Sequence, residues 1–177
     1  MEAGIGGAKL QVFTGDITEQ ETDAVVNAAN KQLAPGGGVA GAIHRAAGSE
    51  LWEKCATMGG CETGEAKITS GYNLPAKWIV HTVGPVYSGS AQDAELLAQC
   101  YTNSLRLVEE QGVESISFPA LSTGAFGYPL EEAAKVALRT VASYLEEQNS
   151  ALKIVRFVLF DQKSKQVHEQ VLKDLGF

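Results

Sequence analysis

Three glycine-rich segments contain the residues of this sequence whose types and spacing could do chemistry. Each follows a short apolar run; they are Gly15-Asp16-Ile17-Thr18, Asn27-Ala28-Ala29-Asn30 leading to Gly36-Gly37-Gly38, and Ser122-Thr123-Gly124-Ala125-Phe126-Gly127. Consecutive glycines let the backbone approach a bulky anion and point N–H groups at it. A helix is predicted from Val39, and its first turn adds partial positive charge at the same place. Two such loops facing each other would bind a diphosphate.

The charge balance indicates how such a ligand must be held. Lys and Arg number 14 against 21 Asp and Glu, so the formal net charge is -7. This is the wrong sign for attraction to a nucleic-acid backbone, and we expect no nucleic-acid partner. Phosphates would have to be bound by main-chain N–H groups and helix ends rather than by a basic patch.

Length and composition predict one globular domain over residues 1–177, with residues 1–8 as a flexible N-terminus. Three scattered cysteines, Cys55, Cys61 and Cys100, indicate reduced thiols and a cytoplasmic protein. The first ten residues lack a basic region and a long apolar run, so neither a signal peptide nor a membrane partner is expected. Isolated histidines at 44, 81 and 168 predict no metal, and no cofactor is implied.

Apolar patterning predicts strands that alternate with helices. The expected strands are Lys9–Thr14, Ala24–Asn27, Ala66–Gly71, Trp78–Val83, Ser115–Phe118 and Ile154–Phe160; the expected helices are Val39–Ala47, Glu50–Ala56, Ala94–Val108, Leu130–Leu145 and Val167–Leu175. Continuously apolar strands with helices between them favour an α/β fold of three layers around a mostly parallel sheet. Ligands of such sheets bind beyond the carboxyl ends of the strands, where the three segments lie. Tyr87–Ala91 is interpreted only as a surface loop.

Other motifs with known chemistry do not fit. Residues 36–41 satisfy the dinucleotide pattern G-x-G-x-x-G, but eight residues separate Asn27 from Gly36, and the next strand ends in Ser70-Gly71 without an acidic ribose ligand. The sequence contains no G-x-x-x-x-G-K-[ST], no G-x-S-x-G and no H-E-x-x-H. A nicotinamide-dependent dehydrogenase, a P-loop NTPase, an α/β-hydrolase and a zincin are therefore disfavoured.

Five segments of the chain together resemble one known family. They are the G-D-I-T turn at 15–18, V-V-N-A-A-N at 25–30, G-G-G-V-A-G-A-I at 36–43, I-V-H-T-V-G-P at 79–85 and F-P-A-L-S-T-G-A-F-G-Y-P at 118–129. They are similar to the macrodomain, an ADP-ribose-binding module, and the resemblance extends from Leu10 to Leu175. It implies a three-layer α/β/α sandwich around a mixed, mostly parallel six-stranded sheet. It also implies ADP-ribose or an ADP-ribosylated protein as the partner.

The resemblance implies that two residues at strand ends bind adenine. Asp16 resembles the aspartate that accepts a hydrogen bond from the exocyclic amine of adenine, with the Ile17 backbone beside it. The alternative is an Asx turn or a helix cap. Phe160 resembles the aromatic residue that stacks on adenine, a contact of roughly 1–3 kcal/mol. The alternative is a core residue at a strand end.

The resemblance assigns the other two segments to the binding of the diphosphate and the distal ribose. The implied phosphate-binding residues are Gly36, Gly37, Gly38, Val39, Ser122, Thr123, Gly124, Ala125, Phe126 and Gly127, with Phe126 also covering the distal ribose. Asn30 resembles the asparagine that hydrogen-bonds this ribose and orients its C1″, and a left-handed turn residue is the alternative. Asn27 is expected to support its loop by backbone hydrogen bonds. His81 is expected to be an interior histidine without a role.

One position departs from the family pattern. MacroD-type hydrolases have an aspartate after G-G-G-V, and Ala40 stands there in this chain. A positioned general base contributes roughly 10²–10⁴-fold to a rate. G-G-G-V-A also occurs in macrodomains regarded as hydrolases, in which a ligand phosphate is proposed to position the water. Catalysis by orientation through Asn30, Gly37 and Phe126 therefore stays open.

The favoured function is a hydrolase that removes mono-ADP-ribose from acidic residues of modified proteins, or that deacetylates O-acetyl-ADP-ribose. The retained Asn30 favours it. A non-catalytic ADP-ribose reader, favoured by Ala40, and an ADP-ribose-1″-phosphate phosphatase are the alternatives. We expect the protein to be a monomer.

Overall fold

The structure is a computed structural model that describes residues 1–147 and 149–177. Its strands are β1 (Glu2–Ile5), β2 (Ala8–Thr14), β3 (Ala24–Ala28), β4 (Ala66–Ser70), β5 (Trp78–Thr82), β6 (Ser115–Phe118) and β7 (Ile154–Leu159). Its helices are the 3-10 turn η1 (Ile17–Glu19), α1 (Gly38–Ala47), α2 (Ser49–Cys55), α3 (Gln92–Glu110), α4 (Leu130–Glu147) and α5 (Gln162–Asp174). Every strand and helix expected from the patterning is present, and the largest difference is that α5 begins at Gln162 rather than Val167.

All the strands form one sheet in the order β1-β2-β7-β6-β3-β5-β4. The five inner strands run parallel, whereas β1 and β4 pair antiparallel at the two edges. The mixed, mostly parallel sheet of an α/β fold is therefore confirmed. Within residues 1–147 and 149–177 this sheet has seven strands rather than the expected six.

The additional strand, β1, corrects the expectation of a flexible N-terminus over residues 1–8. Glu2–Ile5 pairs with residues 8–11 through a tight turn at Gly6 and Gly7, whose φ angles are 58° and 83°. Such a glycine pair is typical of a two-residue hairpin. Ile5 is buried in the core. The segment is short and glycine-rich, so its patterning alone did not indicate a strand.

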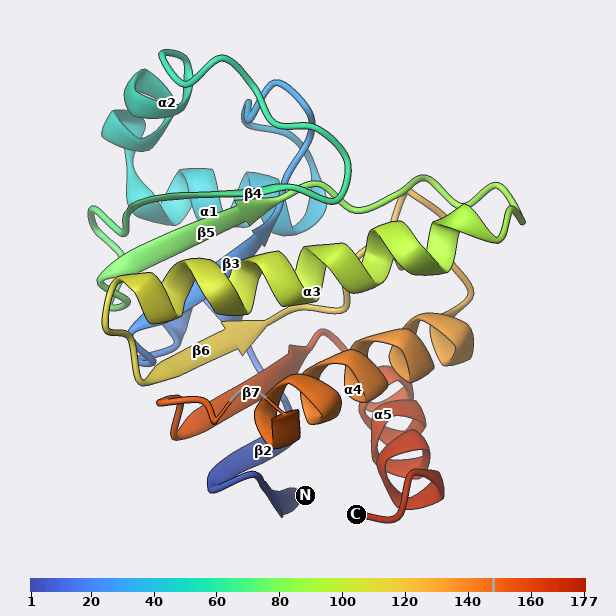
Figure 1. Cartoon of the computed structure of the whole chain (residues 1–177). Coiled ribbons are helices and arrows are strands. Elements are labelled where there is room, and N and C mark those ends of the chain that lie inside the picture. Colours follow the sequence, from blue (N-terminus) through green and yellow to red (C-terminus); the bar gives the residue numbers. More distant parts are fainter. Residues whose placement is uncertain (148) are drawn as a thin grey trace.

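Two apolar clusters cover the two faces of the sheet. The larger cluster joins α3, α4 and α5 to one face around Tyr101, Phe118 and Phe157, and Figure 1 shows α3 and α4 in front of the sheet. The smaller cluster packs α1 and α2 against the other face, with Ile43 and Ile79 among its buried side chains. The strands serve both clusters because successive side chains point to opposite faces.

β3 and β6 are neighbours in the sheet, but the helices that follow these two strands lie on opposite faces of it. β3 leads to α1 on one face, whereas β6 leads to α4 on the other. Their ladder is limited to the pairs Ala24–Ile116 and Val25–Ser117, at the amino end of β3 and the middle of β6. In open α/β sheets ligands bind outside the carboxyl ends of the strands at such a switch point. The loops that follow β3 and β6 emerge on either side of it.

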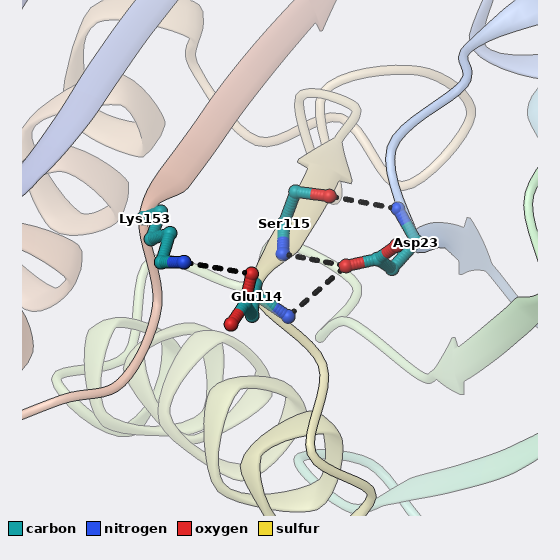
Figure 2. A network of polar contacts seen from close by, with 4 residues as sticks. All are labelled: Asp23, Glu114, Ser115 and Lys153. Atoms are coloured by element: carbon teal, nitrogen blue, oxygen red, sulfur yellow. Dashed lines mark hydrogen bonds and ion pairs between the residues drawn. The ribbon is translucent and has the colours of Figure 1, made fainter.

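At the amino ends of the same strands, Asp23 connects β3 to β6 (Figure 2). Its carboxylate accepts hydrogen bonds from the N–H groups of Glu114 at 3.1 Å and Ser115 at 3.2 Å. Its own N–H donates to Ser115 Oγ at 2.8 Å. Lys153, just before β7, forms a 3.0 Å ion pair with Glu114. Because the ladder joins β3 to β6 over only two residue pairs, these side-chain bonds reinforce the junction.

We predict that Asp23→Ala lowers the free energy of unfolding by about 1 kcal/mol. Two hydrogen bonds to a charged acceptor are lost, and water partly replaces them because the site is exposed. Asp23→Asn keeps one acceptor oxygen and should lose less. Urea unfolding followed by circular dichroism measures both variants. Equal losses in the two would show that the acceptor oxygen does not hold the junction.

Candidate functional site

The glycine-rich segments lie at one edge of the sheet, beyond the carboxyl ends of neighbouring strands, and the loop after β6 is the one seen to the right in Figure 1. Asp16 follows β2, Phe160 follows β7, residues 122–127 follow β6, and Asn30 and residues 36–39 follow β3. The strand order β2-β7-β6-β3 therefore sets the order of the groups along the edge. A carboxylate comes first, then an aromatic ring, then the two loops. The structure brings the predicted site residues to one edge in this order.

The first loop presents a run of main-chain N–H groups at the start of a helix. Gly37 is the N-cap of α1, and the Gly41 N–H donates to the Gly37 carbonyl at 3.2 Å. The N–H groups of residues 36–40 donate to none of the residues that the structure describes. Unpaired amides and the helix dipole make such a helix end a site for anions. The first loop can therefore bind a phosphate without a cationic side chain.

The second loop is closed by its own hydrogen bonds. The Tyr128 N–H donates to the Ser122 carbonyl at 2.9 Å, and the Gly127 N–H donates to the Gly124 carbonyl at 3.0 Å. The three N–H groups of residues 124–126 have no acceptor in the described part of the chain. Successive free amides of this kind form concave anion-binding sites. The two loops therefore present comparable groups from either side of the β3–β6 junction.

Most glycines of the chain are required by the fold, but four of those in the three segments are not. Of the 19 glycines, 11 have a positive φ. At Gly41, Gly71 and Gly84, an added Cβ would come within 2.3 Å of another atom. At the remaining five, nothing lies closer than 3.4 Å; they are Gly4, Gly15, Gly36, Gly37 and Gly124. Four of these five lie in the three segments. Close approach of a molecule other than the protein itself explains glycine at such positions.

Asp16 has one carboxylate oxygen engaged and one free. Oδ1 accepts hydrogen bonds from the Thr18 N–H at 2.9 Å and the Thr18 hydroxyl at 2.7 Å, which makes Asp16 the N-cap of η1. The helix-cap alternative is therefore right for Oδ1. No described residue donates to Oδ2, and the side chain is exposed, so Oδ2 can accept from a ligand. Ile17 is buried beneath this turn and anchors it.

The backbone of the Asp16 turn is held by a second polar chain. Gln20 Nε2 donates to the Asp16 carbonyl at 2.8 Å, and Arg156 Nη1 donates to Gln20 Oε1 at 3.1 Å. The Arg156 guanidinium also lies 5.0 Å from the centre of the Phe13 ring. A cation over an aromatic face is attracted to it. The turn is thus fixed from β7, the strand that Phe160 directly follows.

Phe160 is 97% exposed, so the alternative of a core residue at the strand end is wrong. Thr14 lies opposite Leu159 in the β2–β7 ladder, and the Gly15 N–H donates to the Leu159 carbonyl at 3.1 Å. Phe160 and Asp16 therefore follow directly from paired strand ends. An aromatic ring without packing partners beside a free carboxylate oxygen is suited to stacking on a base.

Asn30 closes its own loop with its side chain. Nδ2 donates to the Ala34 carbonyl at 2.9 Å, and Oδ1 accepts from the Ala34 N–H at 2.9 Å. The left-handed residue of this turn is Leu33, with φ 59°, and not Asn30. An amide keeps one further donor and one further acceptor position. A Cβ at Gly36 would lie 3.5 Å from Nδ2, so the amide group lies beside the first loop.

Phe126 is half-buried, and its backbone is held by a segment that the patterning did not single out. The Tyr87 N–H donates to the Phe126 carbonyl at 2.8 Å, and the Tyr87 and Tyr128 rings lie 5.0 Å apart. Interpreting Tyr87–Ala91 only as a surface loop was therefore incomplete. The available signal was its place after β5, at the same carboxyl edge as the three segments.

A buried polar chain lies on the sheet face that α1 covers. Asn27 Nδ2 lies 3.1 Å from His81 Nδ1, and Thr69 Oγ1 lies 2.9 Å from His81 Nε2. A neutral imidazole with its proton on Nε2 satisfies both contacts, because Nδ1 then accepts from Asn27 and Nε2–H donates to Thr69. His81 is the interior histidine that was expected. Asn27 pairs with His81 in the β3–β5 ladder, and its side-chain amide adds a contact that was not expected.

Ala40 and His44 lie one turn apart on the buried side of α1. Neither imidazole nitrogen of His44 has a partner among the described residues. Burial lowers the pKa of His44, and burial together with the nearby His44 lowers the pKa of His81 to about 3. Both imidazoles are therefore neutral near pH 7. α1 offers a methyl group at position 40 and no charged base on the next turn.

Residues 1–147 and 149–177 hold no cluster of His, Cys, Asp or Glu side chains that could bind a metal ion. Among the same residues, no helix combines the length and the apolar character that crossing a membrane requires. Two surface depressions of about 300 and 370 Å³ lie along α3, and Arg106 lines both. They contain none of the predicted site residues.

Comparison with known proteins points to one family. A family model described as Macro domain matches residues 26–137. A Macro domain-containing protein of Methanosarcina mazei is 52% identical over 157 residues, which cover 88% of this chain and 83% of the relative. ADP-ribose glycohydrolase MACROD1 of Rattus norvegicus is 49% identical over 93% of this chain and 64% of its own length. The Oceanobacillus iheyensis macrodomain solved with ADP superposes with a TM-score of 0.95 at 44% identity, covering 99% of this chain and 95% of that one.

We predict that the free energy of unfolding falls as the pH drops from 7.5 to 5.5. The unfolded chain binds a proton at His81 near pH 6.5, whereas the folded chain binds it only near pH 3, so acid favours unfolding throughout that interval. His44 and His168 act in the same direction because burial also lowers their pKa. His81 alone contributes about 1 kcal/mol of loss at pH 5.5, because its folded pKa of about 3 lies well below that pH.

Urea unfolding at the two pH values measures this loss. Long-range ¹H–¹⁵N correlation of the imidazole groups gives an independent check, in which His81 should remain neutral with its proton on Nε2 at pH 5.5. A protonated His81 at that pH would contradict the prediction.

Proposed function

Because the chain belongs to the macro domain family, we propose that it binds ADP-ribose at the carboxyl edge of its sheet and hydrolyses its bond to acidic side chains of modified proteins. The relative named ADP-ribose glycohydrolase supports both parts of the proposal. The observation that carries it is the pair of free-amide runs at residues 36–40 and 124–126. Both runs contain glycines that the fold itself does not need.

The order of groups along the edge matches the order of parts in ADP-ribose. Adenine stacks on Phe160 and donates its amine hydrogen to Asp16 Oδ2. The diphosphate lies between the two loops, where main-chain amides and the α1 dipole offset its charge. The distal ribose then reaches Asn30 and Phe126. A ligand that spans four adjacent strand ends uses every predicted segment at once.

The chemistry of the leaving group supports hydrolysis without a base at position 40. Water adds its oxygen to C1″ of the distal ribose, the bond from C1″ to the side-chain carboxyl oxygen breaks, and the water proton passes to solvent. A carboxylate with an ordinary pKa of about 4 departs as a stable anion and needs no proton beforehand. Asn30, Gly37 and Phe126 orient the ribose, and the ligand phosphate orients the water. Deacetylation of O-acetyl-ADP-ribose at the same site and a cytoplasmic location belong to this proposal.

The test is release of ADP-ribose from a protein that carries mono-ADP-ribose on glutamate, together with calorimetry of free ADP-ribose binding. We expect micromolar binding and release faster than in buffer. Ala40→Asp should raise the release rate at least tenfold, because a positioned base contributes roughly 10²–10⁴-fold. Binding without release would favour the non-catalytic reader over the hydrolase. Release of phosphate from ADP-ribose-1″-phosphate, without release of ADP-ribose from protein, would favour the phosphatase. Absence of binding would refute the proposal.

We predict that Gly124→Val weakens ADP-ribose binding at least tenfold without lowering the melting temperature. The new side chain projects into space that no protein atom occupies within 4 Å, beside the free amides. Gly4→Val is the matched control, because Gly4 is equally unconstrained but lies in β1. Calorimetry and thermal unfolding of both variants measure the outcome. Equal binding by the two variants would exclude the second loop from the phosphate site.

A further inference from the structure

Ser122 begins the second loop in a conformation that serine seldom adopts. Its φ is 67°, in the left-handed region that glycine favours. The residue is only 7% exposed, and its hydroxyl has no hydrogen-bond partner within the described chain. Its carbonyl nonetheless closes the loop by accepting from the Tyr128 N–H at 2.9 Å. Something outside the loop must hold Ser122 in this strained and buried position.

Gly84, two residues after β5, is the residue against which the Ser122 hydroxyl packs. A Cβ built on Gly84 would lie 2.1 Å from Ser122 Oγ, so a Cα hydrogen of Gly84 points at that oxygen. Such C–H···O contacts are weakly favourable. The φ of Gly84 is not positive, and the next nearest atoms to the added Cβ, at 3.4 and 3.6 Å, also belong to Ser122. A methyl group at position 84 would therefore force Ser122 to move.

The segment after Gly84 supports the same loop at a second point. The Tyr87 N–H donates to the Phe126 carbonyl at 2.8 Å. Asp93, at the start of α3, fixes this segment in turn, because its carboxylate accepts from the N–H groups of Ser88 and Gly89 at 2.9 Å. The loop is held at Ser122 by Gly84 and at Phe126 by Tyr87. The free amides of residues 124–126 lie between these two points.

We propose that Gly84 is a positioning residue for the diphosphate site. By leaving room for the Ser122 hydroxyl, it fixes the left-handed turn that aims the amides of residues 124–126 at the ligand. Gly84 itself touches no ligand and acts only through Ser122. The expected effect on ADP-ribose affinity rests on the proposed function. The expected effect of Gly84 on the conformation of the loop can be tested without ligand.

The test is a double-mutant cycle of Gly84→Ala and Ser122→Gly, with ADP-ribose affinity measured by calorimetry at 15 °C on variants whose folding is verified by circular dichroism. In the wild-type background, Gly84→Ala should weaken binding at least fivefold. In the Ser122→Gly background, where the obstructing hydroxyl is absent and glycine accepts the positive φ, Gly84→Ala should change affinity less than twofold. A purely structural loss would not depend on residue 122 in this way.

Backbone amide NMR shifts of residues 124–126 provide the ligand-free readout. Gly84→Ala should move them, and adding Ser122→Gly should largely remove that difference. This separates the two proposals, because a wild-type chain that fails to bind ADP-ribose refutes the function while the shifts still report on Gly84.

If Gly84→Ala does not fold, the double variant decides. Binding within twofold of Ser122→Gly supports the proposal. Loss of folding or binding in the double variant overturns it, as does unchanged affinity of Gly84→Ala in the wild-type background.

Discussion

The site depends on main-chain amides that the fold leaves unpaired. A chain with a net charge of -7 repels a dianion at long range and has no predicted basic patch to offset this. Attraction must therefore be short-ranged and directional, from N–H groups already aimed at the ligand. Residues 36–40 and 124–126 supply such groups from two loops. If these N–H groups were ordered only when the ligand binds, the free-energy cost of ordering them would weaken the affinity. Folding must therefore fix their orientation beforehand, so the affinity depends on how rigid the two loops are.

That rigidity comes from contacts at both ends of the strands. The β3–β6 ladder is limited to two residue pairs, which Asp23 reinforces at the amino ends of the strands, and the loops diverge at the carboxyl ends toward opposite faces. The first loop rests on α1 and is closed by Asn30. The second is closed by Tyr128 and supported by Gly84 and Tyr87. Each loop is thus held by its own hydrogen bonds, and the N–H groups that these bonds do not use remain free for the ligand.

The sequence predicted the sheet and helices well because buried strands and amphipathic helices carry a strong apolar pattern. It missed the first turn of α5, where residues 162–166 are polar and the start is set by Asp161, which caps the Ser164 N–H at 2.8 Å. It also missed β1, whose glycines form a turn rather than a break.

For the site, residue types predicted which segments meet but not how each side chain is used. The exposure of Phe160 depends on what packs around the end of β7, which no local pattern encodes. The two hydrogen bonds between Asn30 and Ala34 are local, but the residue types alone did not indicate them. The need for glycine at position 84 arises from Ser122, far along the chain, so only the folded structure reveals it.

Ala40 links the binding and the chemistry of the site. An aspartate at this position would add a negative charge near the diphosphate, in a protein that is already acidic, and would weaken ground-state binding while supplying a base. Alanine removes both effects. Interactions made equally with the bound ligand and with the transition state lower the ligand concentration needed for saturation but do not raise the turnover rate. Under the proposed function, a site built from fixed amides with a methyl group at position 40 stabilises bound ADP-ribose without supplying a base. Hydrolysis at such a site requires a leaving group that is itself a stable anion, and the acidic side chains of modified proteins meet that requirement.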